Sequence, residues 1–338
     1  MNWDQYCLEF KKRAKECGKT DEYCKKWLDY AYKLNVQGLP IIYTQEHLGY
    51  LVGYKMEYLY AASNAPRYFY RHYKIPKKAG GYREISEPLP NLKEIQRWIL
   101  ENILIHLDSS VYAKAYIKHK SIKDNARFHR KQKVLLTLDI KSFFDSISSD
   151  KVYDVFKGLG YADDVVVLLT NLCCLNGCLP QGAPTSPMLS NIILFDFDCA
   201  VGLYTKEQKI RYTRYADDMT FSGEFSPGKI ISFVKRNLNP LGLKLNEEKI
   251  RVRRQNQCQE VTGIVVNQKM QLPKKIRKEI RQELFYIQKY GLESHMDYAQ
   301  IKQENYLLHL KGIIQHGLFI NPHDEELRGY LQSLNELS

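Results

Sequence analysis

The sequence contains no apolar run that could cross a bilayer, because no stretch approaches the roughly eighteen consecutive apolar residues of a spanning helix. Its start shows no basic segment followed by an apolar one, so we expect no secretory signal. A disordered or fibrous chain is excluded as well, since 44% of the residues are apolar and 26% are charged. We therefore expect a cytoplasmic protein without a membrane partner.

The eight cysteines lack the spacing of a zinc or redox site. No two of them form a CxxC pair, and Cys173, Cys174 and Cys178 lie close together without a second pair of ligands. Disulfides are not expected without a secretory signal. We predict that the cysteines are reduced and structural.

Acidic residues are too few to balance the basic ones. The chain has 50 Lys and Arg against 38 Asp and Glu, which gives a net charge of +12. Such an excess suits a polyanion, and the 25 tyrosines suit one with bases on which aromatic rings stack. Nucleic acid is the favoured partner, and a merely basic protein is the alternative.

Hydrophobic periodicity predicts an α+β fold with helices at both ends. Residues 1–60 show helical spacing, and residues 66–90 alternate around a glycine-rich turn as a basic hairpin does. Strands and helices then interleave without a regular βαβ repeat, and a strand is expected through 261–266. A basic helix opens at Pro273, for which we favour contact with nucleic acid over a solvated charged face.

Three aspartates stand where carboxylates are unusual. Asp139 ends an apolar strand, and Asp217 and Asp218 lie at the tip of an expected hairpin. If these strands are neighbours, the carboxylates meet at one edge of a sheet. Hard oxygen ligands in that number suit Mg²⁺, which leaves room for substrate phosphates.

The tetrapeptide Tyr-Ala-Asp-Asp occurs twice, which provides an internal control. The copy at 161–164 precedes a helical pattern, and acids favour the start of a helix without any metal. The copy at 215–218 lies between two strand-like segments, where a helix cap has no place. We therefore assign the chemistry to the second copy.

Four motifs, in order, resemble the palm motifs of reverse transcriptases. They are Leu138-Asp139-Ile140-Lys141-Ser142-Phe143-Phe144-Asp145-Ser146-Ile147, Leu179-Pro180-Gln181-Gly182-Ala183-Pro184-Thr185-Ser186-Pro187, Arg214-Tyr215-Ala216-Asp217-Asp218 and Gly242-Leu243-Lys244-Leu245-Asn246-Glu247-Glu248-Lys249. Two further strings, Asn125-Ala126-Arg127-Phe128-His129 and Val261-Thr262-Gly263, resemble elements typical of retron reverse transcriptases. The resemblance implies a right-hand polymerase fold: a helical N-terminal region at 1–60, fingers and palm with an antiparallel sheet at 61–268, and a helical thumb that binds RNA and DNA at 269–338.

By this resemblance, Asp139, Asp217 and Asp218 are the catalytic metal ligands, with the Ile140 carbonyl as a helper, and they hold two Mg²⁺ ions, or alternatively Mn²⁺. Phe144 would exclude the ribose 2′-hydroxyl, with a plain core phenylalanine as the alternative. The other residues expected to contact the nucleotide are Gln181, Gly182, Arg83 with Lys77 or Lys78, and Lys249, which would protonate the pyrophosphate. For Arg83 the alternative is an exposed hairpin arginine, and for Lys249 it is an ordinary lysine at a helix end.

The resemblance assigns recognition of the cognate RNA to the two retron-like strings. The residues concerned are Asn125, His129, Val261, Thr262 and Gly263. For His129, a packed histidine that hydrogen-bonds the backbone is the alternative. Duplex RNA is read mainly by shape, phosphates and 2′-hydroxyls, and loops are read by stacking.

The implied function is that of a retron RNA-directed DNA polymerase. Such an enzyme uses dNTPs to copy a structured non-coding RNA, starts from a guanosine 2′-hydroxyl, and keeps the branched RNA-linked cDNA (msDNA) bound. An effector protein, a separate RNase H and a role in defence against phage are implied too. The alternatives are another bacterial reverse transcriptase, of group II intron or diversity-generating type, or a catalytically silent RNA-binding scaffold.

Overall fold

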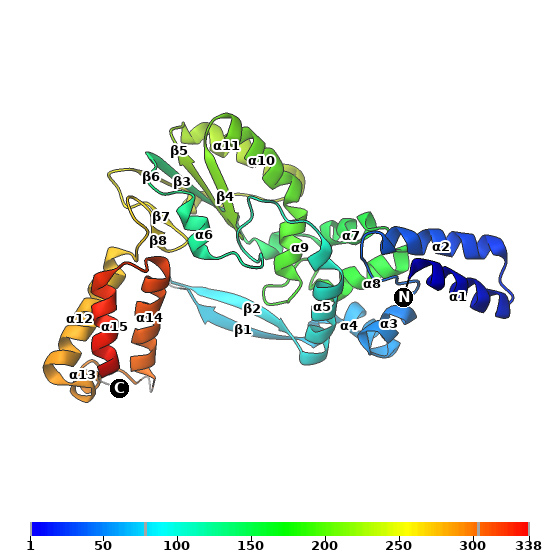
Figure 1. Cartoon of the computed structure of the whole chain (residues 1–338), viewed down its shortest axis with the longest axis horizontal. Coiled ribbons are helices and arrows are strands. Elements are labelled where there is room, and N and C mark those ends of the chain that lie inside the picture. The colour runs from blue at the N-terminus through cyan, green and yellow to red at the C-terminus, as the bar shows by residue number, and fades with distance from the viewer. Residues whose placement is uncertain (1, 78–79, 303–304, 337–338) are drawn as a thin grey trace. The chain divides into compact units, whose positions relative to one another are not determined.

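The computed structural model describes residues 2–77, 80–302 and 305–336 (Figure 1). Contacts divide the chain into two compact units, each of which is described by itself. The first comprises Met1–Ser110, Lys141–Phe197 and Leu238–Lys244, and the second comprises Val111–Ile140, Asp198–Asn237 and Leu245–Ser338. This division follows compactness, so the functional bounds at residues 60 and 268 stay predictions. Lys78 lies outside the described residues.

The first unit is mainly helical. Thr20 and Thr44 begin two of its helices, and each side chain accepts a hydrogen bond from a backbone N–H three residues on, as N-caps do. Its helices are α1 (Trp3–Glu16), α2 (Asp21–Asn35), α3 (Gln45–Val52), α4 (Met56–Asn64), α5 (Pro90–Asn102), α7 (Ser149–Gly158), α8 (Asp163–Cys173) and α9 (Ser186–Ile193). The expected helical character of residues 2–60 is confirmed.

A hairpin completes the first unit. Strand β1 (Tyr70–Pro76) pairs antiparallel with β2 (Tyr82–Pro88), from Tyr70 opposite Pro88 to Pro76 opposite Tyr82. Most of its residues are exposed, and burial increases toward the end at which Tyr70 and Pro88 meet. The basic hairpin predicted from alternation is therefore present.

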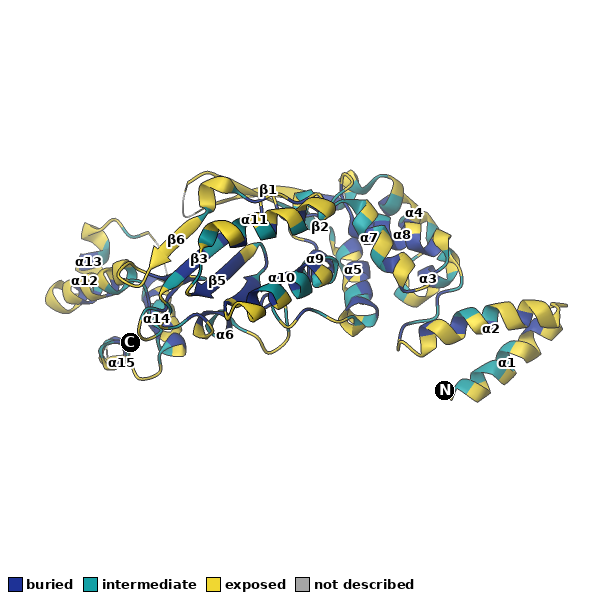
Figure 2. Cartoon of the chain, turned by 90° about the horizontal axis from the view of Figure 1, so that it is seen from above, coloured by how far each residue is buried: buried dark blue, intermediate teal, exposed yellow. Residues whose placement is uncertain are grey.

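The second unit is built on a four-stranded antiparallel sheet. Its strand order is β4-β5-β3-β6, and the strands are β4 (Arg211–Tyr215), β5 (Asp218–Gly223), β3 (Val134–Asp139) and β6 (Arg251–Arg254). The central strands β3 and β5 are mostly buried, as Figure 2 shows, which explains why the apolar run of β3 has no polar alternation. Edge strand β6 is exposed and carries three arginines, which discourage pairing with another chain.

Helices accompany this sheet. Short α6 (Ile122–Arg127) begins with a capping box in which Ser121 and Asp124 bond each other's backbone N–H. The others here are α10 (Phe195–Glu207) and α11 (Pro227–Leu238). The predicted α+β class, with an antiparallel sheet and helices, is confirmed.

The strand expected through 261–266 is wrong in one respect. The chain forms a small hairpin there, in which β7 (Glu260–Val261) pairs with β8 (Ile264–Val265). Thr262 and Gly263 make the turn with φ of 46° and 81°. Two positive φ values in a two-residue loop match the twist of the strands, and glycine tolerates this conformation without strain.

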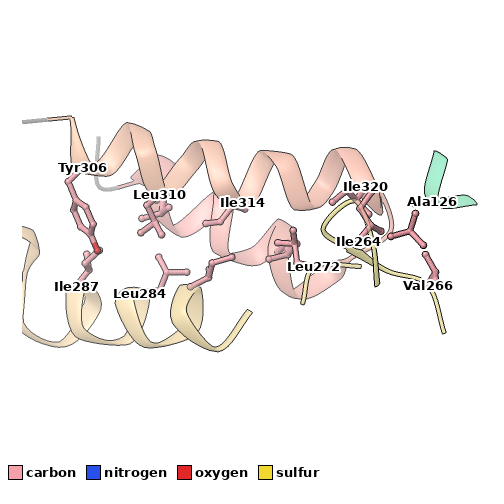
Figure 3. Packing of buried hydrophobic residues seen from close by; sticks show 14 of the residues in the cluster. Ala126, Ile264, Val266, Leu272, Leu284, Ile287, Tyr306, Leu310, Ile314 and Ile320 are labelled. Carbon is pink, nitrogen blue, oxygen red and sulfur yellow. The ribbon is translucent and has the colours of Figure 1, made fainter. Parts of the chain in front are cut away.

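The C-terminal helices share one core with this hairpin. They are α12 (Lys274–Tyr290), α13 (Leu292–Tyr298), α14 (Tyr306–Ile320) and α15 (Glu325–Glu336). Figure 3 shows Leu284 and Ile287 of α12 facing Leu310 and Ile314 of α14, with Ile264 and Val266 continuing the cluster toward Ala126 of α6.

Some of the basic side chains at the start of α12 form ion pairs within the protein. Arg277 forms ion pairs with Asp324 and Glu326, and Arg281 pairs with Glu326 as well. These contacts tie α12 to the start of α15. Other basic side chains of the helix, such as Lys274 and Lys278, remain exposed.

Among the described residues, no single helix has the length and apolar content of a segment that spans a bilayer. The consecutive helices α9 and α10 reach these limits only when taken together, and a bend of 50° separates them.

Candidate active site

The sheet register brings two of the predicted carboxylates face to face. Asp139, the last residue of β3, is the Cα partner of Asp218, the first residue of β5. Directly opposed residues of an antiparallel pair point to the same face, so both carboxylates lie on one side of the sheet edge. Asp139 is only 6% exposed, whereas Asp218 keeps an exposed surface.

The third carboxylate lies in the tight turn between β4 and β5. Tyr215 pairs with Asp218, which leaves Ala216 and Asp217 as the two turn residues. The backbone N–H of Ile140 donates to the Asp217 carbonyl at 3.1 Å, so the end of β3 is fixed against the turn. Ala216 has φ of 58°, a left-handed conformation that strains a residue with a Cβ.

A buried ion pair holds this strained turn. Arg214 is fully buried, and its Nε and Nη2 donate to the two carboxylate oxygens of Asp198 at 2.9 and 2.7 Å. Its remaining nitrogen, Nη1, donates to the Ala216 carbonyl at 3.0 Å, and the hydroxyl of Tyr212 donates to Asp198 at 2.7 Å. The guanidinium therefore links helix α10 to the turn that carries Asp217.

Electrostatics show that the three acids attract a cation. The Lys249 ammonium donates to Asp139 at 2.7 Å. Desolvation and the charges of Asp217 and Asp139 raise the pKa of Asp218 to about 7. Burial opposes the charge of Lys249, yet its hydrogen bond to Asp139 and the charges of all three aspartates raise its pKa above the usual value.

The donor chemistry fits a divalent metal ion. Within the described residues, no three His, Cys, Asp or Glu side chains form a ready-made metal cluster. However, Asp139 and Asp218 offer hard oxygens on one face, and their repulsion is relieved here by the Lys249 ammonium. Such a set suits an ion that keeps waters and takes further oxygens from phosphates. Mg²⁺ itself stays a prediction.

Two predicted nucleotide contacts lie beside the hairpin of the first unit. The Gln181 carbonyl accepts from the Ser86 N–H of β2 at 2.8 Å. Gly182 has φ of 133°, and a Cβ there would lie 2.7 Å from the Ser86 carbonyl oxygen. Glycine is therefore required for this close approach, which fixes the motif's loop against β2.

The other two predicted contacts of this unit are more accessible. Arg83 of β2 is exposed. Phe144 is half-buried, whereas its neighbour Phe143 is 5% exposed, and their rings lie 5.1 Å apart. This difference agrees with Phe143 as the core residue of the pair and leaves Phe144 the accessible ring.

Asn125 and His129 form a buried network with the sheet of the second unit. Thr213 of β4 donates its hydroxyl to Asn125 Oδ1, and the two nitrogens of His129 lie 2.7 Å from the hydroxyls of Thr213 and Ser222. Burial, with the charges of Arg211 and Lys114, lowers the pKa of His129 to about 3, so the imidazole is neutral. These contacts fix Asn125 and His129 to strands β4 and β5, and RNA recognition by the two residues stays a prediction.

The second retron-like string lies beside the first. Val261 is buried in one cluster with Ala126 of α6, whereas Gly263 is exposed at the tip of the β7–β8 hairpin and Thr262 is half-buried. Helix α6 contacts both β7 and β8, so the two strings are far apart in the sequence and adjacent in the fold. The predicted RNA-recognition residues of the second unit therefore belong to one local structure.

Sequence reasoning missed the residues that hold the site. Sequence analysis assigns no role to Asp198, Arg214 or Tyr212. One detectable signal is that Asp196 and Asp198 interrupt the otherwise apolar stretch from Ile192 to Val201. The pairing of Asp198 with Arg214 was not detectable, because it joins a helix to a strand through tertiary packing.

Comparison with known proteins agrees with these observations. Residues 75–266 match the family described as reverse transcriptase (RNA-dependent DNA polymerase). The retron Ec86 reverse transcriptase of Escherichia coli is 34% identical over 262 residues, which cover 76% of this chain and 82% of that protein. The retron Mx65 reverse transcriptase of Myxococcus xanthus is 31% identical, with 86% and 71% covered.

A solved structure of apo telomerase from Candida tropicalis, truncated from its C-terminal domain, aligns with a TM-score of 0.44 and 14% identity. The alignment covers 60% of this chain and 55% of that one, and a score this low supports no inference. The family match and the retron relatives confirm the predicted family. The chain belongs to the reverse transcriptases of the retron type, and it is an RNA-directed DNA polymerase.

Proposed function

We propose that this polymerase transfers nucleotides at metal ions held by Asp139, Asp217 and Asp218, with the Ile140 carbonyl as a further oxygen. The single observation that carries this proposal is the register of β3 and β5, which opposes Asp139 and Asp218 at one sheet edge. Bound Mg²⁺, or Mn²⁺ in its place, would activate the attacking hydroxyl and stabilise the leaving pyrophosphate.

The chain's own residues orient the reactants. Lys249, which bonds Asp139 in this structure, carries a proton that it can give to the pyrophosphate. Arg83 is exposed on β2 and suits a triphosphate, and Gln181 and Gly182 are fixed to the same strand. Phe144 is accessible enough to exclude a ribose 2′-hydroxyl.

The template we propose is a structured non-coding RNA encoded with the protein. Its relatives are named as retron reverse transcriptases, which supports copying from a guanosine 2′-hydroxyl into branched, RNA-linked DNA. The net charge of +12 supports retention of such a product, since each neutralised phosphate releases counterions. An effector protein, a separate RNase H for the template and a role in defence against phage complete the proposal.

The test is to express the protein with its upstream flanking DNA, purify it and analyse the bound nucleic acid on a denaturing gel. We expect a discrete short DNA that shifts after RNase and after a debranching enzyme. The Asp217→Asn/Asp218→Asn variant should carry RNA without this DNA. A DNA insensitive to debranching would contradict the 2′-hydroxyl start, and RNA alone in the wild type would favour an inactive scaffold.

A further inference from the structure

A cavity in the C-terminal part of the second unit has no role in the proposed catalysis. It measures about 680 Å³ and lies between α12 and α13. Its lining residues come from both helices and are Gln282, Glu283, Tyr286, Tyr290, Ser294, His295, Tyr298 and Ala299. A planar aromatic ligand fits within this volume.

Three tyrosines give the cavity aromatic walls. Tyr286 stacks on His295 with ring centroids 5.8 Å apart and on Tyr290 at 6.2 Å. Tyr298 is 92% exposed. Exposed aromatic rings of this kind serve as stacking surfaces for nucleobases.

One carboxylate supplies a polar anchor. Glu283 Oε2 lies 2.6 Å from His295 Nε2 and also accepts from the hydroxyl of Tyr306, whose ring reaches from α14 toward α12 in Figure 3. His295 is 6% exposed, so a buried side chain fixes the position of the Glu283 carboxylate. The second oxygen, Oε1, accepts from neither of these groups, and the Glu283 side chain is 34% exposed in the cavity lining.

Positive charge borders the cavity. Exposed Lys278 precedes Gln282 by one helical turn, so the two share a face of α12. The Lys289 ammonium lies over the rings of Phe285 and Tyr290, at 5.6 and 5.1 Å from their centroids. Lysines beside stacking rings suit the phosphates that flank a base.

We propose that this cavity receives an unpaired guanine base of the RNA that the polymerase binds. The inference rests on the proposed function, because that function supplies the RNA. Glu283 Oε1, the oxygen that His295 and Tyr306 do not engage, only accepts hydrogen bonds, and guanine offers it two adjacent donors on one edge, N1–H and the N2 amine. Adenine and cytosine each present one amine beside a ring acceptor, which the carboxylate repels.

The test uses nine-nucleotide oligouridines with one central guanine, adenine or uracil, and fluorescence anisotropy with the full chain. We expect the guanine oligonucleotide to bind about tenfold more tightly than the uridine one. Glu283→Gln should remove the preference for guanine over adenine, since an amide nitrogen can face the base. Equal binding of the three oligonucleotides by the wild type overturns the proposal.

Matched variants separate the base from general charge. Tyr298→Ala should weaken binding of the guanine oligonucleotide about tenfold, and Tyr298→Phe should retain it, because stacking needs only the ring. Glu279→Gln, one turn earlier on α12, and Tyr50→Ala, an 85% exposed tyrosine of α3, should bind as the wild type does. An unchanged guanine preference in Glu283→Gln overturns the role of the carboxylate.

Two further measurements distinguish RNA from a free nucleotide as the source of the base, and failure of this proposal from failure of the polymerase function. Guanosine monophosphate alone should show no saturation below about 1 mM, because it lacks the flanking phosphates, and tighter binding would overturn the assignment to RNA. Primer extension on the same samples tests the polymerase separately. Extension by a wild type that shows no guanine preference would defeat this inference and leave the polymerase function standing.

Discussion

The same tetrapeptide, Tyr-Ala-Asp-Asp, adopts two different structures in this chain. At 161–164 it precedes and opens helix α8, where Asp163 forms an ion pair with Lys157 and accepts from the Tyr153 hydroxyl. At 215–218 it forms the turn between β4 and β5, where Asp218 opposes Asp139. Identical residues therefore begin a helix in one unit and form a turn at a sheet edge in the other.

The flanking residues decide which structure forms. Gly160, with φ of 93°, lies between the end of α7 and the first copy. The apolar run from Val165 to Leu169 then continues the first copy as helix α8. The second copy follows the buried Arg214, which bonds the Ala216 carbonyl and holds a backbone conformation that alanine disfavours. We therefore infer that the chemistry proposed for the second copy depends on the turn around its acids, which is strained at Ala216 and held by Arg214.

The largest contrast between the copies should be catalytic. We expect Asp217→Asn/Asp218→Asn to lower the rate of primer extension by about 10³-fold or more, because charged oxygen ligands for the metal are lost. Asp163→Asn/Asp164→Asn should extend a primer within about twofold of the wild-type rate. Thermal melts of both variants serve as the folding control. A comparable loss in the two variants would contradict the assignment of chemistry to the second copy.

The second contrast concerns the buried Arg214–Asp198 ion pair, which holds the turn of the second copy. Asp198→Asn should destabilise the protein by about 3 kcal/mol, because it leaves the fully buried Arg214 without its counter-charge. Replacing the whole group, as Tyr212→Phe/Arg214→Met/Asp198→Leu, should restore most of that stability. Urea denaturation measures both effects.

Extension by this triple variant then tests positioning. Its turn lacks the bond from Nη1 to the Ala216 carbonyl, so we expect primer extension to stay about tenfold or more below wild type even where stability has recovered. The loss should appear in kcat and not in KM for the nucleotide. Full activity in a stable triple variant would show that the ion pair is structural alone.

The comparison also shows what the sequence can and cannot predict. Strand β3, the β1–β2 hairpin and helix α8 follow from local periodicity, and the hairpin at the second copy follows from its strand-like flanks. The sequence predicts one strand where the β7–β8 hairpin forms, because the turn depends on positive φ values at Thr262 and Gly263 that residue propensities do not reveal. The Arg214–Asp198 pair and the His129 network depend on tertiary packing, which no spacing encodes.

The stability of the sheet that carries the second copy should depend on pH through His129, which bonds strands β4 and β5. The pKa of buried His129 is lowered to about 3, against 6.5 ordinarily, so the unfolded chain takes up a proton there before the folded protein does. Its stabilising contribution is present above pH 6.5 and is lost as the pH falls toward 3. Between about pH 7 and 5 the loss should be about 2 kcal/mol.

The variant His129→Gln provides the measurement. It should be less stable than wild type at pH 7, because the hydroxyls of Thr213 and Ser222 lose their partners, and the difference should narrow by about 2 kcal/mol at pH 5. His106→Gln, which alters an exposed histidine of the first unit, controls for substitution as such. A gap between His129→Gln and wild type that stays constant with pH would contradict the neutral, buried imidazole.

The smallest contrast is one methyl group removed from each copy. Ala216→Gly should stabilise the protein by about 1 kcal/mol, because φ of 58° strains alanine and suits glycine. Ala162→Gly should leave stability nearly unchanged, since Ala162 has ordinary extended angles at the start of α8, where glycine is also accepted. Urea denaturation of the two variants compares their free energies of unfolding. The rate of primer extension by Ala216→Gly should stay within about twofold of wild type, because the carbonyl that Arg214 binds is retained. Destabilisation by Ala216→Gly would mean that the buried methyl packs more favourably than the turn is strained.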